Sequence, residues 1–181
     1  MRNSSLIKKA LDLDHHLSQR LSIVDTPGPI RNLAIFFAHS GDSWFWLIGL
    51  GFLWFIGNET WKIRSMITAI SILILAALVL LIKFSIRRKR PDGKWGDIYR
   101  KTDPHSFPSG HAARAAMLAI LAFGISPGII GLLLAIWAPL VILARVFMGV
   151  HYLSDVIAGA LLGIGAGLLA LLIIRLFGVP F

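Results

Sequence analysis

Five apolar stretches constrain the fold of this chain more than any other feature of its sequence. They lie at residues 44–57, 66–82, 115–125 together with the polar residues just before it, 129–144 and 156–174. A helix that crosses a bilayer needs roughly 20 mostly apolar residues, and fewer where the bilayer is thin. Hydrophobic residues make up 56% of the chain, a fraction that soluble domains rarely reach. We therefore expect an all-α fold, a polytopic membrane helix bundle of about five transmembrane helices.

The N-terminal segment has a different pattern. Over residues 4–24, apolar side chains recur at helical spacing while charged and polar residues fill the opposite face. The apolar positions are Leu6, Ala10, Leu13, Leu17 and Leu21. This pattern predicts an amphipathic helix that lies along the membrane interface, and the charges within it exclude a signal peptide. After a break at 26–29, a short apolar segment leads into the first span.

These segments predict a single integral membrane domain over residues 1–181. Its expected parts are 1–39 as the interfacial helix and short apolar segment, 42–177 as the transmembrane core, and 86–107 as an active-site loop. The loop is assigned to function because it is longer than ordinary connections. In the last span Gly159, Gly163 and Gly167 recur every four residues, which lets another helix approach closely.

The chain is strongly basic and contains no cysteine. Its 18 Lys and Arg against 9 Asp and Glu leave a formal net charge of +9, which favours an anionic partner. So few residues lie outside the membrane that a phosphate or an anionic lipid is expected rather than nucleic acid. Without cysteine, disulfide and thiolate chemistry are excluded. The oligomeric state stays open.

Polar side chains are costly at membrane depth, and here they gather at three places. The first holds Lys83 and Arg90, the second Ser109, Gly110 and His111, and the third Arg145, His151 and Asp155. No span separates the first place from the second, and two spans separate the second from the third. All three therefore lie on one face of the membrane, where a compact bundle brings them together.

The first property these groups share is an affinity for anions. The cations Lys83, Arg90 and Arg145 form a cage that matches the oxygens of a phosphoryl group. A helix that begins near Pro108 would add free backbone N–H groups, which bind anions at a helix N-terminus. Those N–H groups belong to Ser109, Gly110 and His111.

The two histidines add the reactive groups. His151 and Asp155 are one helical turn apart, so the carboxylate can hold the far imidazole nitrogen and fix its tautomer. A neutral, oriented imidazole in a cationic pocket is a nucleophile for phosphorus, and His111 opposite it can protonate the leaving oxygen. The loop acids are scattered, so we expect chemistry with no metal and no other cofactor. These acids are Asp92, Asp97 and Asp103.

The same residues resemble the signature of the type-2 phosphatidic acid phosphatases, relatives of bacterial acid phosphatases and vanadium haloperoxidases. The family pattern is a lysine, six residues and Arg-Pro; then Pro-Ser-Gly-His; then Ser-Arg, five residues, His, three residues and Asp. This chain has Lys83 with Arg90-Pro91, then Pro108-Ser109-Gly110-His111, then Ala144-Arg145 with His151 and Asp155. Ala144 departs from the family serine, and the spacing is kept throughout.

The resemblance implies a hydrolase that releases the terminal phosphate of a lipid phosphate or polyprenyl diphosphate. It implies that His151 is the nucleophile that becomes phosphorylated, that Asp155 orients it, and that His111 is the general acid. The phosphate-binding residues would be Lys83, Arg90, Ser109, Gly110 and Arg145. The residues around Arg114 resemble the branch that acts on isoprenoid diphosphates. The family also implies an extracytoplasmic site, whereas the positive-inside rule alone would place this Lys/Arg-rich face in the cytoplasm.

Several alternatives stay open. Phosphatidic acid or phosphatidylglycerol phosphate presents the same terminal phosphoryl group, a non-catalytic anionic-lipid binder or transporter would use the same cations, and a haloperoxidase would hold vanadate there. We interpret Arg87, Arg88 and Lys89 as passive membrane anchors. Arg114 suits a structural ion pair as well as a substrate contact. The other histidines, His15, His16, His39 and His105, are interpreted as interfacial or loop residues.

Overall fold

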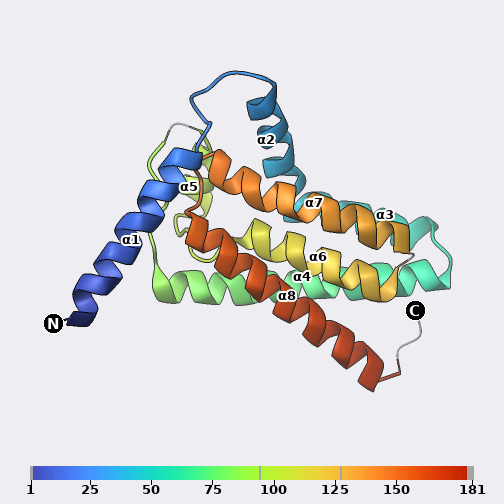
Figure 1. Ribbon diagram of the computed structural model, residues 1–181. Coiled ribbons are helices and arrows are strands. Elements are labelled where there is room, and N and C mark those ends of the chain that lie inside the picture. Colours follow the sequence, from blue (N-terminus) through green and yellow to red (C-terminus); the bar gives the residue numbers. More distant parts are fainter. Residues whose placement is uncertain (1, 94, 127, 179–181) are drawn as a thin grey trace.

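The computed structural model describes residues 2–93, 95–126 and 128–178, which form a bundle of helices (Figure 1). The elements are α1 (Arg2–Leu21), α2 (Pro29–Ser40), α3 (Ser43–Ile56), α4 (Glu59–Ile86), α5 (Asp97–Thr102), α6 (Gly110–Ile125), α7 (Gly128–Phe147) and α8 (Leu153–Leu176). Within these ranges there is no strand, only an isolated bridge between Lys89 and His105. The predicted all-α class is therefore confirmed.

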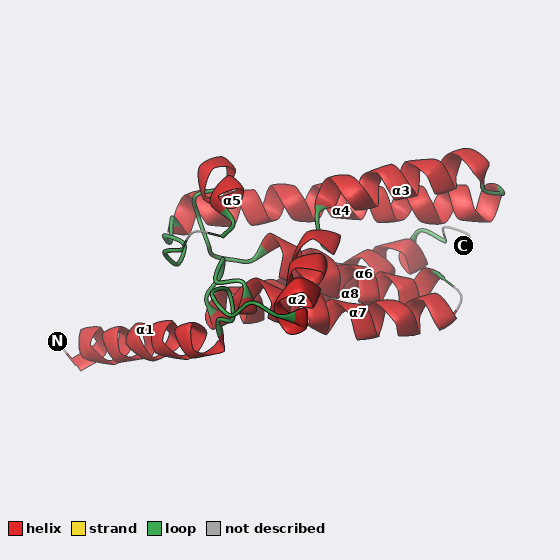
Figure 2. Cartoon of the chain, turned by 90° about the horizontal axis from the view of Figure 1, so that it is seen from above, coloured by secondary structure: helices red, strands yellow, loops and turns green. Residues whose placement is uncertain are grey.

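Helix α6 is the centre of the bundle. It packs against α7 and α8, and most of its side chains are buried. Seen from above, α3 and α4 form one layer and α6, α7 and α8 the other (Figure 2). The sequence of α6 is rich in alanine, and such small side chains let neighbouring helices approach closely.

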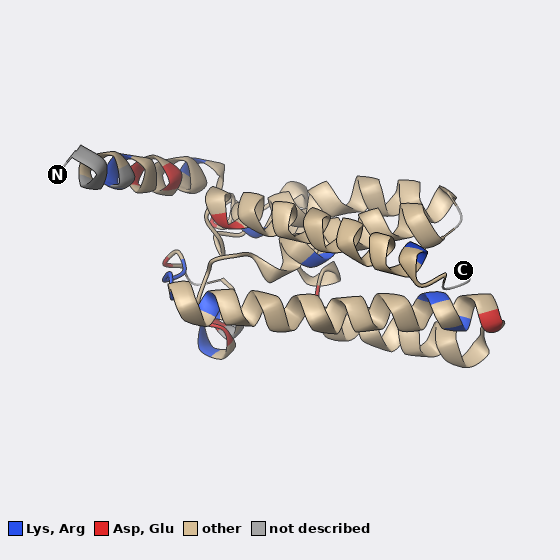
Figure 3. Cartoon of the chain, turned by 90° about the horizontal axis from the view of Figure 1, so that it is seen from below, with Lys and Arg blue, Asp and Glu red and all other residues tan. Residues whose placement is uncertain are grey.

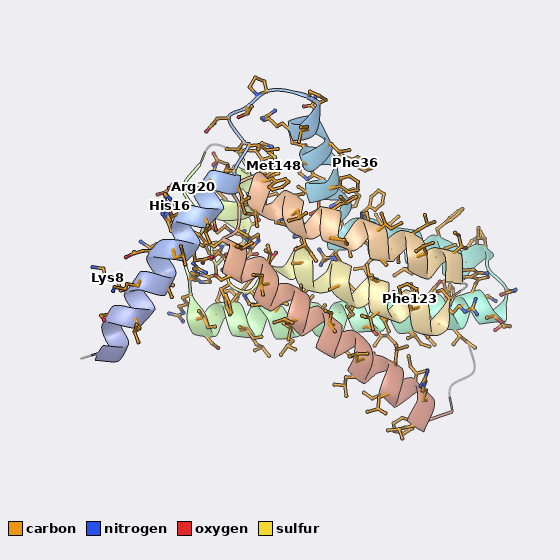
Figure 4. The ribbon with its side chains drawn as sticks, viewed as in Figure 1. Lys8, His16, Arg20, Phe36, Phe123 and Met148 are labelled. Carbon is orange, nitrogen blue, oxygen red and sulfur yellow. The ribbon has the colours of Figure 1, made fainter. Side chains whose placement is uncertain are left out.

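Each of the five predicted apolar stretches forms a helix of its own. Helices α4, α7 and α8 are long and apolar enough to cross a bilayer, whereas α3 and α6 are apolar but shorter. The outward side chains of these five helices are largely hydrophobic, as Phe123 of α6 shows, and Phe36 of α2 is exposed in the same way (Figure 4). Charged residues lie mostly at the two ends of the bundle (Figure 3). This distribution is typical of a protein embedded in lipid.

Two predicted boundaries differ from the structure. Helix α4 begins at Glu59 rather than near residue 66, because Asn58 caps it by accepting a hydrogen bond from the Trp61 N–H at 3.1 Å. The 86–107 segment, expected to be a loop, contains the short helix α5, which starts after Gly96 in the left-handed conformation (φ 80°). Capping and turn geometry, which hydropathy does not register, account for both differences.

The glycine ladder of α8 makes the predicted close approach to α6. Gly159, Gly163 and Gly167 are all buried. A Cβ atom added to Gly163 would collide with the carbonyl group of Ala113, and one added to Gly159 would collide with the carbonyl oxygen of Ser109. Both obstacles are backbone atoms, so they cannot move without separating the two helices.

We expect Gly163→Ala to destabilise the protein. The added methyl group must push α6 and α8 apart, and overpacking of this kind costs about 1–3 kcal/mol. Thermal unfolding in detergent should show the loss as a lower Tm. Gly165→Ala is the matched control, because a Cβ atom at Gly165 meets nothing within 4 Å. Equal Tm values for the two variants would contradict the packing role.

Candidate active site

The three predicted clusters meet around one cavity of about 420 Å³. It lies where the end of α4, the 86–107 segment, the start of α6 and the start of α8 converge. Its polar lining includes Asp42, Lys83, Arg90, Tyr99, Asp103, His111, Arg114 and His151, and Gly110 also lines it. The prediction that these clusters share one end of the bundle is confirmed.

His151 lies between α7 and α8, with its side chain almost completely buried. Its Nε2 atom is 3.0 Å from Nη1 of Arg90, and its Nδ1 atom is 3.5 Å from Oδ2 of Asp155. Burial, with the positive charges of Arg90, Arg145 and Lys83, lowers the pKa of His151 well below its usual value. The imidazole is therefore neutral at neutral pH, and the lone pair of its Nε2 atom accepts a hydrogen bond from Arg90, which phosphorus would replace during attack.

Asp155 is completely buried and held from two sides. Its Oδ2 atom accepts a hydrogen bond of 2.9 Å from the Tyr152 N–H, and its Oδ1 atom accepts one of 2.8 Å from Nη1 of Arg88. The carboxylate therefore has a fixed orientation beside the imidazole of His151. The two groups are close as predicted, but Nδ1 of His151 has no hydrogen-bond partner among the described residues, so the contact is electrostatic rather than the predicted hydrogen bond.

Arg88 is not the passive anchor that its position in a basic run suggested. Besides the contact with Asp155, its guanidinium donates to Ser154 Oγ at 2.6 Å and to Asp14 Oδ2 at 2.7 Å. Its Cζ atom is also 4.0 Å from the centre of the Tyr152 ring. The interpretation failed because the partners lie 66 to 74 residues away in the sequence.

Lys83 and Arg90 share the carboxylate of Asp103, to which the sequence pattern assigned no role. Nη2 of Arg90 donates to Asp103 Oδ2 at 2.8 Å, and Nζ of Lys83 donates to the same oxygen. Lys83 also donates to the carbonyl oxygen of His105 at 2.8 Å. Asp103 therefore engages both cations on the cavity wall, as an anionic ligand of the same geometry would.

Arg145 is a fully buried cation whose hydrogen-bonding capacity is only partly used. Nη1 donates to the carbonyl oxygen of Ala38 at 3.1 Å, and the Cζ atom lies 4.4 Å from the centre of the Tyr99 ring. Nε and Nη2 have no hydrogen-bond partner among the residues that the structure describes. Buried donors without acceptors are costly, so this guanidinium is suited to bind an anion.

Sequence reasoning missed two partners of His111. Its Nε2 atom lies 2.7 Å from Oδ1 of Asp42, and the Tyr99 ring packs edge-on against it. An ionised carboxylate only accepts hydrogen bonds, so this contact assigns a proton to Nε2, which donates it to Asp42. The signal for Asp42 was its position as the acid in the short connection between two apolar segments.

His39 also belongs to this group and is not merely interfacial. Its Nδ1 atom lies 2.9 Å from the Tyr99 hydroxyl and 3.5 Å from Oδ2 of Asp42. Burial raises the pKa of Tyr99, so its hydroxyl keeps its proton. These residues form a polar network that holds the carboxylate of Asp42 against His111.

Ser109 differs from its predicted use, whereas Gly110 lines the cavity as expected. The Ser109 N–H is not free, because it donates to the carbonyl oxygen of Asp155 at 3.0 Å, and its buried hydroxyl caps α6 by accepting from the Ala112 N–H at 3.4 Å. The N–H groups of Gly110 and His111 follow, in the first turn of α6, where no intrahelical acceptor precedes them.

The structure also shows what Arg114 and Ala144 contact. Nε of Arg114 donates to the carbonyl oxygen of Gly41 at 2.9 Å, and Nη1 donates to the Ser43 hydroxyl. These bonds fix the connection between α2 and α3, so Arg114 has a structural role although it borders the cavity. Ala144 is buried in an apolar cluster with Ala38 on α2, where a serine hydroxyl is not needed for packing.

Similar proteins point to one family. A family model described as PAP2 superfamily matches residues 64–178. A decaprenylphosphoryl-5-phosphoribose phosphatase of Mycobacterium tuberculosis is 32% identical over 148 residues, which cover 81% of each chain. An undecaprenyl-diphosphatase of Sulfolobus acidocaldarius is 34% identical over 137 residues, covering 74% of this chain and 66% of that protein.

Two solved structures share the fold. A PAP2 type phosphatidylglycerolphosphate phosphatase from Bacillus subtilis superposes with a TM-score of 0.70 over 90% of this chain and 84% of its own, at 24% identity. Aquifex aeolicus LpxE superposes with a TM-score of 0.65 over 86% of this chain and 93% of its own, at 27% identity. The matched region of the family model includes every residue of the three clusters.

Proposed function

The chain belongs to the PAP2 superfamily of membrane lipid phosphatases, and from this premise we propose that its substrate is a polyprenyl-linked phosphate or diphosphate. One observation carries the proposal: two histidines and the cations Lys83 and Arg90 line a cavity that has an apolar wall on one side. The names of the two sequence relatives, both of which act on polyprenyl compounds, support the choice of lipid.

The apolar wall suits an isoprenoid tail. It comes from α4, with Ile72, Leu75 and Val79 among its residues. A second cavity of about 440 Å³ lies between α4 and α8, is lined almost entirely by hydrophobic side chains, and shares Leu75 with the first. The phosphate would enter sideways from the bilayer while the tail stays in this apolar space.

The reaction proceeds in two steps. Nε2 of His151 attacks phosphorus as the bond between phosphorus and the leaving oxygen breaks, and protonated His111 gives that oxygen a proton and becomes neutral. Water then attacks the phosphohistidine, His111 takes a proton from the water, and the bond between phosphorus and His151 breaks to release phosphate. Asp155 stabilises the positive charge that develops on the His151 ring.

The cations and backbone donors would stabilise the charge of the transferring phosphoryl group. Lys83, Arg90 and Arg145 supply side-chain donors, and Gly110 supplies an N–H group. Asp103 must leave Lys83 and Arg90 when the phosphoryl group binds, because it occupies their donors. Ser109 contributes as the cap that sets the start of α6. These groups supply the positive charge, and we propose that no metal ion is needed.

A substrate panel tests this proposal. Purified protein in detergent and EDTA should release phosphate from polyprenyl phosphates and diphosphates, with a higher kcat/KM than for phosphatidic acid or phosphatidylglycerol phosphate. A preference for either glycerolipid would overturn the choice of substrate. No hydrolysis of any lipid phosphate, with binding retained, would instead identify a binder or transporter that uses the same cations.

We also propose that the whole chain is one catalytic domain in the cell membrane, with its site on the extracytoplasmic face. The positive-inside count that favours the opposite orientation includes Arg88 and Arg90. Both are engaged with the carboxylates of Asp14, Asp103 or Asp155, which supports leaving them out of that count. Protease access to tags at the two termini in sealed vesicles would decide the orientation.

A further inference from the structure

Helix α1 is connected to the site by a continuous set of charged contacts. Asp14 of α1 accepts hydrogen bonds from Arg88, from the Ser154 N–H at 2.9 Å and from the Ser154 hydroxyl at 2.5 Å. One turn later, Ser18 accepts a hydrogen bond of 2.8 Å from the Leu153 N–H. Two side chains of α1 therefore cap the N-terminus of α8, the helix that carries Asp155.

Arg88 links that cap to the carboxylate behind His151. Nη2 binds Asp14, while Nη1 binds both Ser154 and Asp155. Its planar guanidinium also stacks on the Tyr152 ring, which limits its rotation. Arg88 does not line the cavity described above, so its effect on the phosphoryl group would pass through Asp155.

We propose that Arg88 and Asp14 are positioning residues for catalysis, and that α1 is thereby part of the catalytic apparatus. This inference rests on the proposed function, in which Asp155 stabilises the charged ring of His151. Asp155 is 3.5 Å from that ring, and its Oδ1 atom is held by Arg88. Without Arg88, the carboxylate would turn toward other donors and lose its alignment with the imidazole.

Steady-state kinetics of the full chain in detergent tests the proposal. Arg88→Ala should lower kcat about 10- to 100-fold. This range is taken by analogy from metal sites, where it is found when the hydrogen-bond partner of a metal-ligating residue is removed. KM should stay within about twofold of the wild-type value, because Arg88 does not contact the bound substrate. Arg88→Lys keeps one charged donor and should recover part of the lost kcat. Lys89→Ala, which removes the exposed neighbouring cation, should leave kcat unchanged.

Asp14 is tested through its dependence on Arg88. Asp14→Ala should lower kcat by about threefold to tenfold in the wild-type chain and have almost no further effect in the Arg88→Ala chain, since coupled residues are non-additive. Asp12→Ala, which removes an exposed acid of the same helix, is the matched control. Thermal unfolding of every variant shows whether a lower kcat comes with a lower Tm, which indicates destabilisation, or with an unchanged Tm, which indicates a loss of positioning.

Three outcomes would overturn the proposal. A raised KM with unchanged kcat for Arg88→Ala would mean that Arg88 binds substrate. Unchanged specific activity of the folded fraction, with a lower Tm, would mean a purely structural role. Additive effects of Asp14→Ala and Arg88→Ala would mean that the two residues act separately. If wild-type protein hydrolyses no lipid phosphate, the proposed function itself fails, which the wild-type assay alone reveals.

Discussion

His151→Ala is expected to abolish phosphate release. The imidazole supplies the atom that bonds to phosphorus, and the neighbouring Lys83 and Arg90 on the cavity wall cannot take over this role, because they are cations without a lone pair to attack with. Removing a nucleophile of a covalent mechanism costs on the order of 10⁶-fold in kcat. The measurement is phosphate release together with acid-quenched trapping of the phosphoenzyme, and both signals should vanish in the variant.

The pH dependence gives a second check on the same residue. Because burial and neighbouring cations lower the pKa of His151, the ring stays neutral below pH 6.5, the ordinary value for a histidine. The acid limb of kcat/KM that belongs to this group should therefore lie below that value. His16→Ala, at an exposed position on α1 (Figure 4), is the control and should behave as wild type. A phosphoenzyme that still forms in His151→Ala would exclude His151 as the nucleophile.

The sequence predicted which residues meet in this bundle, but not all of the contacts between them. Counting spans was enough to predict that Lys83, His111 and His151 lie at one end of the bundle, because each span carries the chain to the opposite face of the membrane. Hydropathy similarly predicted the five apolar helices, and glycine spacing predicted that another helix approaches α8 closely, which the structure identifies as α6.

The contacts that sequence reasoning missed depend on side-chain geometry across long sequence separations. Asp42 meets His111 across 69 residues and Asp14 meets Arg88 across 74, so no local pattern links either pair. Arg88 stands in a basic run next to a membrane span, where the ordinary interpretation is an anchor. A count of charges along the sequence does not show that Arg88 pairs with Asp155, a buried carboxylate on another helix.

Arg145→Met is expected to lower kcat by about 10²- to 10³-fold, equivalent to about 3–4 kcal/mol, by analogy with removal of one oxyanion-hole donor. The guanidinium is fully buried and does not line the cavity, but its Nε and Nη2 atoms lack partners within the described residues, so we expect them to turn to the phosphoryl oxygens in the transition state. Because these buried donors lack acceptors, Arg145 lowers the stability of the folded protein when no substrate is bound. An apolar side chain of similar volume removes an uncompensated buried charge, and such replacements are often neutral or stabilising.

Activity and stability should therefore move in different directions at Arg145, and Arg114 provides the matched comparison. Arg114→Met also removes a buried arginine beside the cavity, but its guanidinium is bonded to Gly41 and Ser43, so this variant should lower Tm. Arg145→Met should keep or raise Tm while losing activity, as expected where a functional group is held at a cost in stability. Measuring Tm and kcat/KM for both variants checks this. Activity of Arg145→Met within a few-fold of wild type would remove Arg145 from the phosphate site, and a large fall in its Tm would show that its donors are already satisfied within the fold.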